Sequence, residues 1–66
     1  MDVRELDVVA LATDLPGEGL NTGDVGTVVH VFHKPYRAYE VEFTDPDGRT
    51  IAMVTLTADQ IRLRDQ

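Results

Sequence analysis

The clearest alternation of apolar and polar residues lies near the middle of the chain. Tyr39, Val41 and Phe43 fall on one face of an extended segment, and Glu40 and Glu42 fall on the other, because successive side chains of a strand point to opposite faces. Residues 45–48 (Asp-Pro-Asp-Gly) then supply the residue types of a tight turn. Residues 50–56 follow as a second apolar, β-branched segment. The pattern predicts a hairpin of two antiparallel strands.

A further strand is predicted over Val25 to His33. It begins beside Gly23 and Gly26, which allow a turn or the close approach of another backbone. Its apolar residues do not alternate strictly, which indicates a β-bulge or burial on both faces. Residues 6–12 and 61–64 are predicted as the first and last strands.

Two connections complete the organisation. Residues 13–23 contain three glycines, a proline and an asparagine, so they are predicted as one long loop, with Leu15 and Leu20 packing back onto the sheet. Residues 57–60 (Thr-Ala-Asp-Gln) have the chemistry of a capped helical turn. The sequence therefore predicts one all-β domain over residues 1–66: a five-stranded, SH3-like, partly open barrel with a helical turn before the last strand.

Length and charge restrict the function classes. A chain of 66 residues without cysteine must obtain its stability from packing or from a partner, because neither disulfides nor thiolate metal sites are available. Twelve carboxylates against six lysines and arginines give a net charge of −6, which disfavours nucleic acid. Such acidity more often serves solubility alone, and the alternative is a basic partner. The sequence has neither a membrane-length apolar run nor a signal-peptide pattern, so we expect a cytoplasmic protein with no membrane association.

Several segments together resemble a known class of small barrels. They are residues 23–28 (Gly-Asp-Val-Gly-Thr-Val) with Val31, residues 39–43 and the closing residues 59–61. Over most of its length the chain resembles a KOW-type or related SH3-like domain, and as a whole it resembles a family of short, uncharacterised bacterial proteins. The KOW resemblance implies an association with ribosomal or transcription proteins, whereas the few basic residues around the glycines depart from that class.

No arrangement of residues predicts catalysis, a cofactor or a metal site. His30 and His33 lie three residues apart and should point to opposite faces of a strand unless a bulge realigns them. Glu40 and Glu42 are expected on a solvated face, without a cleft to raise a carboxyl pKa. The segment 45–48 resembles the start of a calcium loop, but it lacks the downstream ligands and is explained by a hairpin turn.

The strand predicted over residues 50–56 has apolar residues on both faces. In one register Ala52, Val54 and Leu56 face the core, and Ile51 and Met53 face outward, either beneath the long loop or at a protein interface. In the other register Val54 and Leu56 are exposed instead. Tyrosine and methionine suit contact surfaces. The candidate interface residues are therefore Leu15, Leu20, Tyr36, Tyr39, Ile51 and Met53.

The sequence thus favours a non-enzymatic protein-interaction module, such as an inhibitor or antitoxin-like partner of a neighbouring protein. Self-association is also compatible with the small core. The alternative is a KOW-like nucleic-acid or ribosome-associated domain that uses Lys34, Arg37, Arg62 and Arg64 as a local basic patch.

Overall fold

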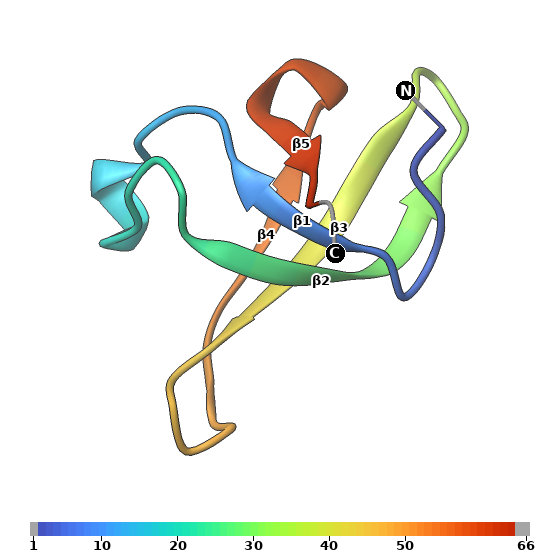
Figure 1. Ribbon diagram of the computed structural model, residues 1–66. Helices are drawn as coiled ribbons and strands as arrows, with labels where there is room; N and C mark the ends of the chain where they lie inside the picture. Colours follow the sequence, from blue (N-terminus) through green and yellow to red (C-terminus); the bar gives the residue numbers. More distant parts are fainter. Residues whose placement is uncertain (1, 65–66) are drawn as a thin grey trace.

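The five strands form a single antiparallel sheet (Figure 1). This computed structural model describes residues 2–64. In chain order the elements are β1 (Val8–Leu11), the 3₁₀ turn η1 (Pro16–Glu18), β2 (Val25–Phe32), β3 (Ala38–Thr44), β4 (Thr50–Leu56), the 3₁₀ turn η2 (Ala58–Gln60) and β5 (Ile61–Leu63).

The strand order across the sheet is β4-β3-β2-β1-β5. The all-β class, the five strands and the helical turn before the last strand are confirmed. The sheet is not closed into a barrel, so β4 and β5 are its two edges. Thr57 and Gln60 form the predicted capping box at η2, with the Thr57 N–H donating to Gln60 Oε1 at 2.9 Å.

The predicted bulge in β2 is present. Val28 lies opposite Val41 and His30 lies opposite Glu40, so Val29 is the extra residue. The glycine just before this region also has a packing role: a Cβ on Gly26 would lie 2.7 Å from Val41 Cγ1 and 2.8 Å from a backbone oxygen. Glycine at this position therefore lets β3 pack closely against β2.

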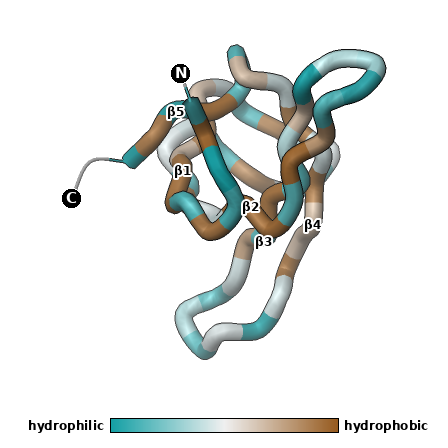
Figure 2. Tube along the Cα trace, turned by 90° about the vertical axis from the view of Figure 1, so that its right-hand side faces the viewer, coloured by the Kyte–Doolittle hydropathy of each residue, from teal (hydrophilic) through white to brown (hydrophobic). Residues whose placement is uncertain are grey.

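The core lies on the concave side of the bent sheet and draws on every strand. Its buried residues are Val3, Val9, Leu11, Leu20, Val28, Tyr39, Val41, Phe43, Leu56 and Ile61. The tip of the β3–β4 hairpin projects away from this core, and its tube is pale or hydrophilic in Figure 2. The hairpin therefore has a packed end and an exposed end.

The long loop between β1 and β2 folds back on the sheet as predicted. Leu15 and Leu20 pair through two backbone hydrogen bonds of 2.9 and 3.1 Å, and η1 lies between them. Leu20 enters the core, and Leu15 packs against it. The loop is thus held by its own apolar residues.

Candidate interaction surface

The outer edge of the sheet is formed by β4, which carries the candidate residues Ile51 and Met53. Ala52, Val54 and Leu56 are partly or fully buried, whereas Ile51 is 57% exposed and Met53 is 49% exposed. The first of the two registers considered from the sequence is therefore the one observed. Both residues are too exposed to lie beneath the β1–β2 loop.

Ile51 lies at an irregularity in the hairpin. Phe43 pairs with Ala52 and Thr44 pairs with Thr50, which leaves Ile51 as an extra, bulged residue. Its side chain lines a shallow, open hollow of about 240 Å³ together with residues of β3 and of the loop before β2. The other lining residues are Leu20, Asp24, Val25, Phe43, Thr44, Asp45 and Pro46. Ile51 is thus an exposed apolar residue at the rim of an apolar hollow.

Met53 lies beside carboxylates. It pairs with Glu42 across the β3–β4 ladder. The Thr50 hydroxyl of β4 donates to Glu42 Oε2, and the Thr55 hydroxyl donates to Glu40 Oε1. These bonds draw both carboxylates toward β4, so the exposed methionine stands next to two negative charges. The two glutamates lie on a solvated face, as predicted.

Four other predicted interface residues lie elsewhere. Leu20 is 3% exposed and Tyr39 is fully buried, so their inclusion in a contact surface was wrong: both side chains fill the core. Leu15 is partly buried against the same core. Tyr36 is 64% exposed in the β2–β3 turn. Of the six candidates, the structure brings only Ile51 and Met53 together on one strand.

The ring and hydroxyl of a tyrosine suit a contact surface, but the alternation of residues 39–43 places Tyr39 on the apolar face of β3, where it is buried. Its hydroxyl has no hydrogen-bond partner within the described residues. A buried hydroxyl without a partner costs about 1–3 kcal/mol. Tyr39 therefore acts as a core ring rather than as a polar contact.

The β1–β2 loop is fixed by a carboxylate as well as by leucines. Asp14 Oδ1 accepts hydrogen bonds from the Thr22 N–H and the Thr22 hydroxyl, both at 2.8 Å. These two donors hold the pKa of Asp14 below its usual value, because they stabilise the ionised form. Asp14 thus connects the two ends of the loop through its hydrogen bonds with Thr22.

The histidines have different neighbours. His30 Nδ1 lies 3.6 Å from Glu5 Oε2, and the His30 ring meets Phe32 edge to face. His33 follows the end of β2 and lines a separate open hollow with Val31 and Arg37. Within residues 2–64, no group of three or more histidine, aspartate or glutamate side chains is arranged to hold a metal ion.

The turn over residues 45–48 closes the hairpin through its own carboxylate. Asp45 Oδ1 accepts hydrogen bonds from the backbone N–H groups of Asp47 and Arg49, both at 2.9 Å. This is the Asx-type turn expected of such a sequence. The hairpin interpretation of this segment is confirmed.

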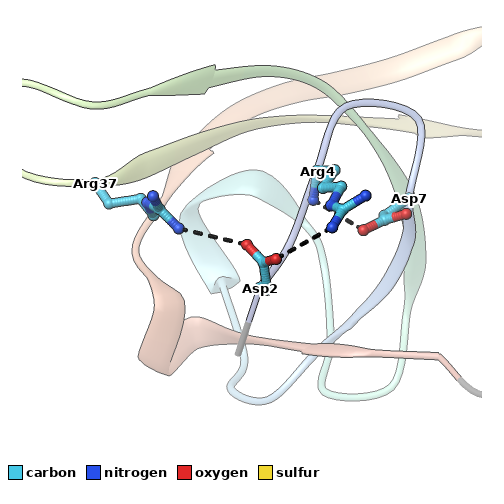
Figure 3. A network of polar contacts seen from close by, with 4 residues as sticks. All are labelled: Asp2, Arg4, Asp7 and Arg37. Carbon is cyan, nitrogen blue, oxygen red and sulfur yellow. Dashed lines mark hydrogen bonds and ion pairs between the residues drawn. The ribbon is translucent and has the colours of Figure 1, made fainter.

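The segment before β1 contributes a contact that the sequence pattern did not reveal. Asp2 lies 3.4 Å from Arg4 and 3.8 Å from Arg37, and the Arg4 N–H donates to Asp7 (Figure 3). Val3, between these charged residues, is buried in the core. A single apolar residue among charges has no periodicity, so no sequence signal indicated its burial.

The chain matches the model of one protein family over nearly all of its length. A family model described as "Domain of unknown function (DUF4926)" matches residues 5–63, which include all five strands. The chain belongs to this family. The resemblance to a family of uncharacterised proteins is therefore confirmed, while the KOW and SH3-like types stay predictions.

Comparison with curated proteins and with solved structures finds no match. In the described part of the chain, no helix is both long enough and apolar enough to span a membrane. The family description names no activity. The most informative feature for function is therefore the surface around β4.

Proposed function

We propose that this chain is a non-enzymatic module that binds a partner protein of basic character, and that it inhibits or stabilises that partner in the manner of an antitoxin. The observation that carries the proposal is the pair of exposed apolar residues on β4, Ile51 and Met53. Exposed apolar side chains on an edge strand are typical of contact surfaces.

Two further observations support a basic partner. The chain carries a net charge of −6, and the carboxylates of Glu40 and Glu42 stand beside the exposed methionine. Complementary charge accelerates association and selects among partners. The strand order and the helical turn before β5 support the further proposal that the domain is SH3-like.

The test is a pull-down from the lysate of the source organism with the tagged chain, read by mass spectrometry with and without nuclease. The double variant Ile51→Ser/Met53→Ser is run beside the wild type, with Leu63→Ser as a control, because Leu63 is also exposed and apolar but lies on β5 at the other edge of the sheet. We expect a nuclease-resistant protein that the wild type and the control retain and the double variant loses.

Two results would contradict the proposal. Retention of the same proteins by the double variant would show that β4 is not the contact surface. Capture of ribosomal or RNA-linked proteins that disappear with nuclease would favour the KOW-like, nucleic-acid alternative instead.

A further inference from the structure

The β4 edge is unusually suited to pairing with another strand. It is seven residues long and contains no charged residue, proline or glycine. An edge strand leaves every second N–H and C=O directed away from the sheet, and natural sheets normally protect such edges with charges, prolines or short strands. Within β4 none of these three protections is present, and the bulge at Ile51 leaves residues 52–56 regularly paired with β3, so their outer edge remains straight enough for another strand.

The side chains beside the edge indicate which kind of strand would fit. Neighbouring strands lie about 4.8 Å apart, so an added strand would lie roughly 10 Å from β3. Glu40 and Glu42 of β3 are already drawn toward β4 by the Thr55 and Thr50 hydroxyls. A lysine or arginine on the added strand can therefore meet these carboxylates across β4.

A second copy of the chain fits this edge less well. Residues 50–56 supply no cation to pair with the glutamates. Two copies joined through β4 would also bring two sets of Glu40 and Glu42 to the same face of one continuous sheet, and each copy carries a charge of −6. Charge thus favours a basic strand over self-pairing.

We infer that an extended basic segment of the partner protein adds to β4 as a sixth strand of the sheet. Its lysines or arginines lie on the side of Glu40 and Glu42, and its alternate apolar residues lie on the side of Ile51 and the hollow. Main-chain hydrogen bonds would supply much of the affinity, and the alternating side chains would supply the specificity. This inference rests on the proposed function, which it makes specific.

The test uses a short, fluorescently labelled, acetylated peptide of alternating lysine and valine, titrated against the wild-type chain by anisotropy at low salt. Two peptides serve as comparisons: one with glutamate in place of lysine, and one N-methylated at every second residue, which removes the N–H donors of one edge. We expect binding of the lysine peptide that weakens as salt rises, at least about tenfold weaker binding of the N-methylated peptide, and none of the glutamate peptide.

The location of binding is tested on the protein. Glu42→Gln should weaken binding of the lysine peptide about two- to fivefold, as loss of one exposed ion pair does. Glu18→Gln removes the same charge from η1 and should leave binding unchanged. Amide hydrogen exchange should slow in β4 when the lysine peptide is bound, because edge N–H groups gain acceptors.

Three results would overturn the inference. Equal binding of the N-methylated and unmodified lysine peptides would exclude strand addition. Unchanged exchange in β4 with the peptide bound would place the contact elsewhere. A dimer of the free chain that Met53→Lys dissociates would make a second copy the occupant. If the pull-down partner is lost with Ile51→Ser/Met53→Ser while the lysine peptide fails to bind, the proposed function stands and only the strand-addition mode fails.

Discussion

The two edges of the sheet differ in almost every respect. β5 has three residues, carries Arg62 in its centre, and begins with a buried isoleucine, Ile61, directly after the capped turn η2. β4 has seven uncharged residues, and its isoleucine, Ile51, is exposed. Shortness and charge protect β5 from further pairing. The contrast shows that the fold can protect an edge, and it makes the unprotected state of β4 the feature that a function must explain.

The largest effect we expect comes from truncating the same residue type at each edge. Ile61→Ala should lower the free energy of unfolding by about 2–5 kcal/mol, because Ile61 is buried in the core. Ile51→Ala should change it by no more than about 0.5 kcal/mol, because that side chain is mostly exposed. Urea unfolding followed by circular dichroism measures both.

A 66-residue domain has little stability in reserve, so Ile61→Ala could leave no folded protein to titrate. The pair Ile61→Val and Ile51→Val then gives the same comparison, with about 0.5–1.5 kcal/mol expected at the buried position. Equal losses of unfolding free energy at the two positions would show that Ile51 is packed against other residues in the free chain. The two edges would then not differ in burial as described.

The next largest effect is expected at Gly26 of β2, the central strand of the sheet. Gly26 pairs with Val9 of β1 and lies against β3, so it connects the half of the sheet that ends in β5 with the half that ends in β4. Gly26→Ala should destabilise the fold by about 1–3 kcal/mol, because the added Cβ would overlap a backbone oxygen and the Val41 side chain.

The matched control for this substitution is Gly17→Ala in η1, where no atom lies within 4 Å of the added Cβ. Thermal melts of both variants measure the effect, and the control should melt at or slightly above the wild-type temperature. If Gly26→Ala melted like Gly17→Ala, β3 would not depend on a close approach at this position.

The smallest effect concerns the loop that follows β1, on the protected side of the sheet. The folded-state pKa of Asp14 is lower than its ordinary value of 3.8, because Thr22 donates two hydrogen bonds to the carboxylate. Its stabilising contribution is therefore complete at neutral pH, declines as the pH falls through 3.8, and is lost once the pH passes below the folded-state pKa.

Asp14→Asn should consequently lower the urea midpoint of unfolding at neutral pH. The difference in midpoint between the variant and the wild type should become smaller in strong acid. Asp47→Asn, a substitution of an exposed carboxylate in the hairpin turn at the β4 side, serves as the control. If the loss of stability caused by Asp14→Asn stayed constant from neutral to acid pH, the contact between Asp14 and Thr22 would not depend on the ionised carboxylate.

Much of this architecture follows from local sequence patterns. The alternation at residues 39–43, the turn at 45–48 and the Thr-x-x-Gln box at 57–60 each determine a structure within a few residues, so the hairpin and the capped turn were predictable. Strand order and the open sheet depend on long-range pairing, which no local pattern encodes.

The candidate surface was predicted less completely for the same reason. Residues 50–56 are apolar on both faces, so the sequence left two registers open, and only the observed pairing shows that Ile51 and Met53 are exposed. Leu20 and Tyr39 have side chains suited to either a core or a contact surface, and burial by distant strands decides between them. Val3 is isolated among charged residues, so its place in the core follows only from the path of the chain.

The hydrogen bonds from Thr50 and Thr55 to the glutamates of β3 have a consequence for colloidal behaviour. At pH 7 the chain carries a net charge of −6, and these glutamates place part of that negative charge beside an uncharged edge, so separate copies repel one another in solution. Near the isoelectric point of the chain, about pH 4.5, this net repulsion would vanish while the bare backbone edge stayed in place. The carboxylates that would recognise a basic strand therefore also act as gatekeepers against self-assembly, and storage near pH 4.5 would be the condition most prone to edge-to-edge aggregation.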